Sequence, residues 1–141
     1  MKYFGFIKEH DDYKYSVNIK DLIKEKNIES PHREEVIEYL EKGNLCVAWM
    51  GGVEDAMDPR FNEENYEDND FMGYSAVDTD GEWFWPEYIV NYLKKYKTIS
   101  IDKNFVNYVL KNKKKEIKLS EEEISELEKL YLNKADSKTI K

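Results

Sequence analysis

One cysteine and two histidines are the only side chains of their kind in 141 residues, and this scarcity limits the chemistry that the chain supports. A single cysteine excludes an intramolecular disulfide framework and is typical of a reducing compartment. Cys46 lies between leucine and valine, so we expect it to be buried and structural. His10 and His32 belong to no H-x-x-x-H, H-E-x-x-H or C-x-x-C pattern, and both lie in polar stretches that should face solvent. The sequence therefore predicts neither a metal site nor a cofactor.

Long apolar runs and nucleotide-binding motifs are also missing. The longest apolar run, residues 45–50, is far shorter than the ~18 residues that a membrane-spanning helix needs. The N-terminus soon reaches charged residues and lacks the apolar region of a signal peptide, so we expect a cytoplasmic protein without membrane contact. No G-x-x-x-x-G-K, G-x-G-x-x-G or G-x-S-x-G sequence occurs, which argues against the common phosphate loops and the hydrolase nucleophile elbow.

Positive charge is in the minority. The chain has 22 Lys and Arg residues against 30 Asp and Glu residues, and the resulting net charge of -8 argues against nucleic-acid binding and favours a basic protein partner. Aromatic residues make up 14% of the chain, and because disordered chains are poor in aromatics, we expect a folded protein with a polar exterior. We predict one globular domain over residues 1–134 and a frayed tail over residues 135–141.

The fold is organised around a turn, two tryptophans and a proline that follow one another between residues 80 and 86. Asp80-Gly81 favours a two-residue type I′ hairpin turn, because both residues tolerate positive φ. Trp83 and Trp85 lie two positions apart, so they should face the same side of a strand and anchor its contact with the helices. Pro86 suits the first position of a helix, where its missing N–H is not needed.

The other segments complete an α+β fold, in which a small antiparallel sheet of three or four strands packs with four or five helices. We expect a short edge strand at residues 3–7 and sheet strands at 44–50, 71–77 and 82–85, the first of them central and buried on both faces. Helices are expected over residues 17–26, from Pro31 to Gly43, over residues 86–96, after Asp102 and after Ser120. Their apolar stripes include Ile89, Val90, Leu93 and Tyr96 in the third helix and Leu127, Leu130 and Tyr131 in the last.

Several helix ends carry local signals. Ser30 is the expected N-cap of the second helix, and Gly43 is expected to provide its left-handed exit. Asp102 should cap the fourth helix. Ser120 and Glu123 form the S-x-x-E capping box of the last helix.

Residues 53–70 show neither a helical nor a strand period and are rich in acidic side chains. Between residues 54 and 87 there are twelve acidic residues and one arginine. Arginine and aromatic side chains anchor interfaces, and acidic side chains around them steer a basic partner. The predicted partner-binding residues are Arg60, Phe61, Glu63, Glu64, Tyr66, Glu67, Asp68 and Asp70.

This segment leads to the hypothesis of a non-enzymatic protein-binding module, an immunity-type or regulatory inhibitor of a basic protein. A segment that is only solvated, and keeps the protein soluble, explains the same charges. The alternative function is a small enzyme that uses Asp55 with Asp58, or Asp78 with Asp80, as acid and base. A working pair needs environments that separate the two pKa values. We assign no residue a catalytic role.

The segment Thr79-Asp80-Gly81-x-Trp83-x-Trp85-Pro86, continued by Ile89, Tyr92 and Tyr96, resembles the TDG-x-W-x-WP segment of a family of uncharacterised bacterial proteins, a domain of unknown function. The similarity covers roughly residues 33 to 105, with aspartate at position 102 where the family usually has proline. The resemblance implies no activity, cofactor or catalytic residue. Some small acidic proteins of this kind accompany bacterial toxins as immunity partners, which is the inhibitor role that we expect.

Overall fold

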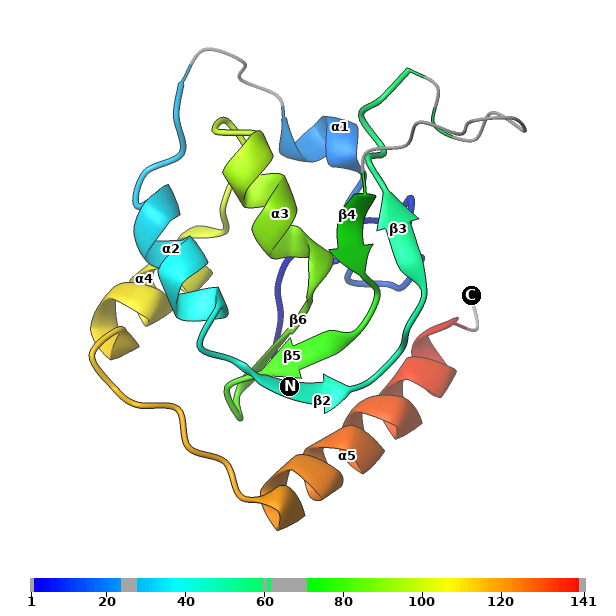
Figure 1. The fold of residues 1–141 in the computed structure, drawn as a ribbon, viewed down its shortest axis with the longest axis vertical. Helices are drawn as coiled ribbons and strands as arrows, with labels where there is room; N and C mark the ends of the chain where they lie inside the picture. Colours follow the sequence, from blue (N-terminus) through cyan, green and yellow to red (C-terminus); the bar gives the residue numbers. More distant parts are fainter. Residues whose placement is uncertain (1, 24–27, 60, 62–70, 140–141) are drawn as a thin grey trace.

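The computed structural model describes residues 2–23, 28–59, 61 and 71–139 (Figure 1). Among these residues the fold is α+β, with five helices, one mixed sheet of four strands and a second sheet of two strands. In chain order the elements are β1 (Lys2–Tyr3), α1 (Ile19–Leu22), α2 (Arg33–Leu40), β2 (Asn44–Val47), β3 (Gly52–Glu54), β4 (Phe71–Tyr74), β5 (Val77–Thr79), β6 (Trp83–Pro86), α3 (Tyr88–Lys95), α4 (Lys103–Asn112) and α5 (Glu121–Thr139).

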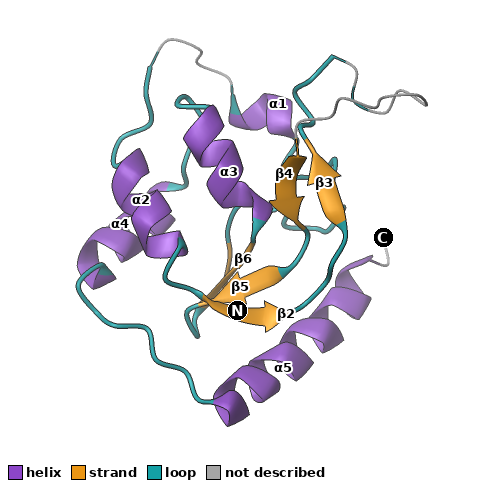
Figure 2. Ribbon diagram, viewed as in Figure 1, coloured by secondary structure: helices purple, strands orange, loops and turns teal. Residues whose placement is uncertain are grey.

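The main sheet has the strand order β1-β6-β5-β2, with β1 parallel to β6 and the other neighbours antiparallel. Strands β3 and β4 form a separate antiparallel hairpin (Figure 2). The prediction of one strand over residues 71–77 is therefore wrong. The strand is interrupted at Ser75, whose N–H donates to the carbonyl of Gly51 at 2.9 Å. As a result, β4 pairs with β3, whereas β5 belongs to the main sheet.

Strand β6 is buried on both faces. Trp83 and Trp85 belong to a core shared with α2, α3 and α4, whereas Phe84 belongs to a smaller core that Tyr131 of α5 closes. In Figure 1, α2, α3 and α4 lie together on one side of the main sheet, and α5 lies beyond β2. Trp85 is fully buried and Trp83 is 5% exposed, which confirms that the tryptophans anchor the contact between sheet and helices.

Strand β2 is an edge strand, so the prediction of a central strand over residues 44–50 is wrong. It ends at Val47, and the side chain of Leu45 is exposed. A bulge between these two residues places both Cys46 and Val47 in the core beneath α5. Cys46 is buried as predicted, and burial raises the pKa of its thiol to about 12, which keeps the thiol protonated at neutral pH.

The loop between β5 and β6 is not a type I′ turn. Among the described residues of this loop, only Gly81 has a positive φ, of 105°. Asp80 Oδ1 accepts from the N–H groups of Glu82 and Trp83 at 2.9 and 2.8 Å, and Thr79 Oγ1 accepts from the N–H of Gly81 at 3.0 Å. Side-chain oxygens therefore close the turn, and a second left-handed residue is not needed.

Pro86 ends β6 opposite Val77, and helix α3 begins at Tyr88 rather than at the proline. The buried stripe of α3 consists of Tyr88, Ile89, Tyr92 and Leu93, whereas the predicted stripe members Val90 and Tyr96 are half-buried. Two tyrosines replace aliphatic residues in this stripe because a tyrosine buries its ring while its hydroxyl reaches a polar partner.

Helix α2 begins after His32, which takes the left-handed conformation at φ 59°. The predicted cap, Ser30, is buried, and its hydroxyl donates to the carbonyl of Ile99 instead. Gly43 does not provide a left-handed exit, since it is not among the residues with positive φ. A Cβ at Gly43 would lie 2.3 Å from Cζ2 of Trp85, so glycine is required here by the close approach of the indole.

Two other N-cap predictions are confirmed. Asp102 accepts from the N–H of Asn104 at 2.8 Å at the start of α4. In the capping box of α5, the N–H of Glu123 donates to Ser120 Oγ at 3.1 Å, and the N–H of Ser120 donates to Glu123 Oε1 at 3.2 Å.

Three element lengths differ from the predictions. Helix α5 continues to Thr139, so its backbone is helical over residues that were expected to fray, and its Leu130 is exposed although Tyr131 is buried. The edge strand predicted over residues 3–7 consists only of β1. Helix α1 ends at Leu22, and residues 24–27 of the predicted helix lie outside the described part of the chain.

Candidate functional site

Residues 53–70, called the acidic segment below, lie mostly outside the described residues. Phe61 is described: it is half-buried, and its ring meets the ring of His10 edge-on at a centroid distance of 5.7 Å. The other predicted contact residues, which the structure does not describe, are Arg60, Glu63, Glu64, Tyr66, Glu67, Asp68 and Asp70. The described part of the candidate site consists of the residues on either side of this segment, before position 60 and from position 71 onward.

Asp55, at the start of the segment, is buried and fully hydrogen-bonded. Its Oδ2 accepts from Lys95 Nζ at 2.6 Å and from the hydroxyl of Tyr96 at 2.5 Å, and its Oδ1 accepts from the N–H of Met57 at 2.9 Å. Burial and, secondarily, the bond to Asp55 raise the pKa of Tyr96 to about 12. These contacts tie the segment to the C-terminal turn of α3, and they engage both carboxylate oxygens of Asp55.

His10 is half-buried, so the prediction that it faces solvent is wrong. Its Nε2 lies 2.6 Å from the hydroxyl oxygen of Tyr92, which also accepts from the N–H of Ala56 at 2.8 Å. Burial lowers the pKa of His10 to about 4 and outweighs the opposite effect of the nearby acidic groups. The Tyr92 hydroxyl also lies within donating distance of the carbonyl oxygen of Glu54, at 3.3 Å, and the tautomer of the His10 ring decides which of the two accepts its proton.

His32 is exposed, as predicted, and its Nδ1 lies 2.8 Å from a carboxylate oxygen of Glu35.

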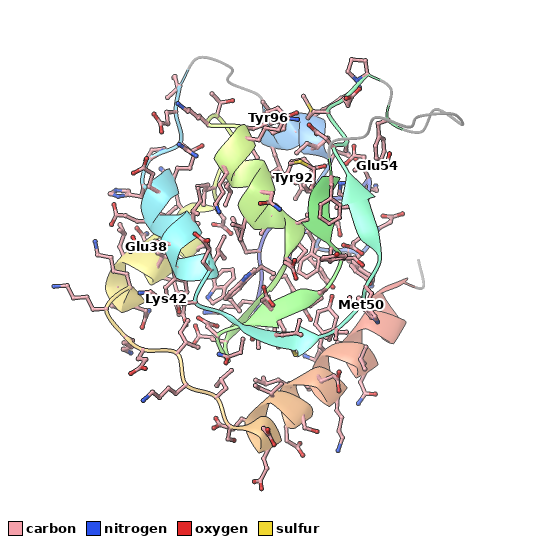
Figure 3. The ribbon with its side chains drawn as sticks, in the orientation of Figure 1. Glu38, Lys42, Met50, Glu54, Tyr92 and Tyr96 are labelled. Carbon is pink, nitrogen blue, oxygen red and sulfur yellow. The ribbon has the colours of Figure 1, made fainter. Side chains whose placement is uncertain are left out.

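Two tyrosines of α3 and a third at its C-cap contact the surrounding loops. Tyr88, Tyr92 and Tyr96 recur every four residues along one side of the helix, and their hydroxyls contact Asp11, His10 and Asp55, respectively. Figure 3 shows Tyr92 and Tyr96 at the same end of the molecule as Glu54. Sequence analysis placed Tyr96 in the apolar stripe of this helix but included neither Tyr88 nor Tyr92. The tyrosine at every fourth position was the sequence signal for hydroxyl groups that contact neighbouring loops.

Asp78 and Asp80 lie in different environments. Asp80 Oδ2 accepts from the hydroxyls of Tyr39 and Tyr108 at 2.6 and 2.7 Å, and its Oδ1 closes the turn described above. Burial and, secondarily, Glu87 raise the pKa of Asp78 to about 7. The sequence analysis missed Glu87 as the neighbour of Asp78. The hairpin register could have revealed it, because Asp78 faces Trp85, two residues before Glu87.

Cavities do not favour the carboxylates as a catalytic site. Five surface cavities of about 160 to 660 Å³ occur among the described residues, the largest between Gly81 and the first turns of α5. Asp55, Asp58, Asp78 and Asp80 line none of these five. Within the described part of the chain, no group of three or more His, Cys, Asp or Glu residues is placed to hold a metal ion.

The outer face of the β3–β4 hairpin carries exposed aromatic side chains. Phe71 and Tyr74 are 56% and 37% exposed, and their rings meet edge-to-face with centroids 5.2 Å apart. Both belong to β4, directly after the acidic segment. Met50, just before β3, is 75% exposed (Figure 3). Sequence analysis missed this surface, because residues 71–77 were expected to form one strand of the main sheet.

The inner face of the hairpin is fixed against α3. Asn91 Nδ2 donates to the carbonyl of Met72 at 2.9 Å, and Gly73, at φ 118°, brings the backbone of β4 against Tyr88. One face of β4 therefore packs against α3, and the rings of Phe71 and Tyr74 lie on the other face.

No protein-family model, curated protein or solved structure matches this chain. Among the described residues, no helix is both long and apolar enough to cross a membrane. The resemblance to a family with a TDG-x-W-x-WP segment stays a prediction.

Proposed function

We propose that this protein is a non-enzymatic protein-binding module, an immunity-type or regulatory inhibitor, whose partner is basic. The observation that carries this proposal is the pair of exposed rings, Phe71 and Tyr74, on a rigid hairpin directly after the acidic segment. Aromatic anchors surrounded by charge are the usual composition of a protein interface.

The distribution of charge supports a directed encounter with such a partner. The segment between residues 54 and 87 carries twelve acidic residues and one arginine, whereas residues 89–118 carry nine lysines and two acidic residues. The first segment includes the β3–β4 hairpin and the second includes α4, which lie on opposite sides of the molecule (Figure 1). A separation of charge of this kind orients an approaching basic protein and increases its association rate.

The state of the carboxylates favours binding over catalysis. Asp55 and Asp80 each have their oxygens occupied by hydrogen bonds that hold the fold. A general acid or base needs an oxygen within reach of the substrate. The raised pKa of Asp78 is the one observation that favours the small-enzyme alternative. The hydrogen bonds of Asp55 and Asp80 favour a structural role for these two carboxylates.

Affinity capture tests this function. Tagged protein serves as bait in a lysate of its own host, and we expect a basic protein to be retained at about 0.05 M salt and released at about 0.5 M, because salt screens charge pairs at surfaces. A test variant replaces the five carboxylates of the undescribed segment by amides: Glu63→Gln, Glu64→Gln, Glu67→Gln, Asp68→Asn and Asp70→Asn. A control variant makes the same change of charge at exposed positions of α2 and α5: Glu34, Glu38, Glu121, Glu122 and Glu126, all to Gln.

Retention by the control variant and loss by the test variant is the expected result. Recovery of no basic protein at low salt, or equal recovery by both variants, would contradict the proposed function.

A further inference from the structure

The rings of Phe71 and Tyr74 form one continuous surface on the hairpin. Their edge-to-face contact at 5.2 Å places both rings on the same side of β4, although the residues lie three apart, because the register with β3 shifts between Val53 and Glu54. The opposite side of β4 faces α3 and includes buried Met72 and Gly73. The two rings contact each other, and the larger part of Phe71 and about a third of Tyr74 remain exposed.

Gly52 of β3 lies next to the Phe71 ring. Gly52 lies opposite Tyr74 in the register, and a Cβ at this position would lie 3.0 Å from Cε1 of Phe71. Any side chain at position 52 would push the Phe71 ring away from the strand. A Cβ at Gly51 would lie 3.4 Å from Ser75 Oγ, which is an ordinary contact. The bare backbone at position 52 is therefore what allows the Phe71 ring to lie flat over β3.

An acidic residue lies opposite one of the rings, and acidic residues precede this ring along the chain. Glu54 is the cross-strand partner of Phe71. The chain that enters β4 at Phe71 has five acidic residues and no basic residue between positions 62 and 70. Aromatic faces attract cations, and carboxylates beside them complete the recognition of a cationic side chain.

We propose that Phe71 and Tyr74 bind an arginine side chain of the basic partner, an inference that rests on the proposed function. The planar guanidinium stacks on an aromatic ring and is more weakly hydrated than an ammonium group, so it loses less on leaving water than lysine does. The aliphatic stem of the arginine covers apolar surface next to the rings, in the direction of Met50.

A titration of the full-length ¹⁵N-labelled chain with synthetic peptides tests this site directly. The probes are an oligoarginine peptide and, at equal length, an oligolysine and an oligoglutamate peptide. We expect the oligoarginine peptide to shift the amide resonances of β3 and β4, the oligolysine peptide to bind more weakly at the same place, and the oligoglutamate peptide to cause no shifts.

Variants assign the binding to the rings. Phe71→Ala together with Tyr74→Ala should weaken oligoarginine binding by about tenfold or more, since two cation–π contacts are removed. Gly52→Ala should weaken it in the same direction by displacing one ring, whereas Gly51→Ala should leave it unchanged. A variant with Leu130→Ala and Leu132→Ala removes exposed apolar side chains of α5 and controls for general loss of apolar surface.

Each outcome separates this inference from the proposed function. Shifts confined to β3 and β4, and lost in the ring variant, support the site. Oligoarginine binding that maps elsewhere, or that survives in the ring variant, overturns the arginine site while leaving a basic partner possible. Absence of oligoarginine binding also overturns the site, and the capture experiment then decides the proposed function by itself. Equal binding of oligoarginine and oligolysine contradicts the preference for arginine.

Discussion

Asp80 accepts four hydrogen bonds, two from the tyrosine hydroxyls of α2 and α4 and two from backbone N–H groups of its own turn. One carboxylate thus joins the β5–β6 turn to two helices. Asp55 has the corresponding role at the other end of the fold, where it joins the start of the acidic segment to Lys95 and Tyr96. In both cases the negative charge is held by donors from the fold itself, which is a structural use of an ionised group.

Replacing Asp80 by alanine should destabilise the protein strongly. The change leaves the hydroxyls of Tyr39 and Tyr108 without their acceptor and opens the turn, so we expect a loss of about 2–4 kcal/mol in the free energy of unfolding, measured by urea denaturation. Glu82→Ala is the matched control, because this neighbour is exposed and pairs only with exposed Lys2. Its effect should stay within about 0.5 kcal/mol. Equal effects of the two changes would contradict the role assigned to Asp80.

Local sequence does not reveal these residue contacts. Asp80 was correctly placed in a turn, but Tyr39 and Tyr108 lie 41 and 28 residues away along the chain. The same holds for His10, whose partner Tyr92 lies 82 residues away. A polar residue in a polar stretch predicts exposure, and only the tertiary structure brings the partner that buries it.

Asp78 should make the protein less stable as pH rises. Burial, with a smaller contribution from Glu87, raises its pKa from 3.8 to about 7 in the folded protein. The folded state therefore binds the proton more tightly than the unfolded state, so the stabilisation is complete below pH 3.8 and is lost as pH rises through 7. Asp78→Asn should raise the free energy of unfolding at pH 7.5 by on the order of 1–2 kcal/mol, allowing for partial exposure, and by less at pH 5. Urea denaturation at both pH values measures this, and a variant less stable than the parent at pH 7.5 would refute it.

His10 should have the opposite effect on the pH dependence of the free energy of unfolding. Burial lowers its pKa from 6.5 to about 4, so the folded state binds the proton less tightly than the unfolded state. The stabilisation is present above pH 6.5 and is lost as pH falls towards 4. In the Asp78→Asn background, where the opposing slope is removed, the free energy of unfolding should therefore decrease over this range. His10→Gln keeps a hydrogen-bonding partner for Tyr92 and should flatten the profile; a profile that keeps its slope would assign the titration to another group.

At the scale of elements, the two helix starts with side-chain caps were predictable, whereas the starts of α2 and α3 and the strand pairing were not. The caps at Asp102 and Ser120 use donors two or three residues away, so the sequence contains the whole signal. The division of residues 71–77 between two sheets depends on the bond from Ser75 to Gly51, across the acidic segment. Exposure of Phe71 and Tyr74 follows from that division. Local sequence patterns therefore could not predict the candidate surface formed by Phe71 and Tyr74.

The contact between the end of α2 and strand β6 is a sharp test of packing. Gly43→Ala places a methyl group 2.3 Å from the Trp85 ring, in a core that has no room to shift. Overpacking of this kind costs about 1–3 kcal/mol in the free energy of unfolding. Gly51→Ala also changes a glycine outside the helices and has neither a close contact nor a positive φ, so it should be nearly neutral. A neutral Gly43→Ala in urea denaturation would mean that the indole and the glycine are not in contact.

At the scale of the whole molecule, the arrangement of charge has a cost for the free protein. The net charge is -8, and the acidic residues are concentrated between positions 54 and 87. Like charges that lie close together repel one another and destabilise the compact state. The acidic segment serves either binding or solubility, and both explanations predict this repulsion. They predict different results when the charges are removed.

The amide variant of the undescribed segment, changed at Glu63, Glu64, Glu67, Asp68 and Asp70, distinguishes these explanations. With less repulsion, its free energy of unfolding should equal or exceed that of the parent by up to about 1 kcal/mol, and its stability should depend less on salt between about 0.02 and 0.5 M. If the segment serves binding, the variant is more stable but captures a smaller amount of the basic partner. This result is expected where charges are retained for function at a cost in stability. If the segment serves solubility, capture is unchanged and the variant precipitates at lower concentration. Urea denaturation at two salt concentrations, the capture assay and a solubility measurement on one preparation decide between them, and a variant that is markedly less stable would show instead that these carboxylates hold the fold.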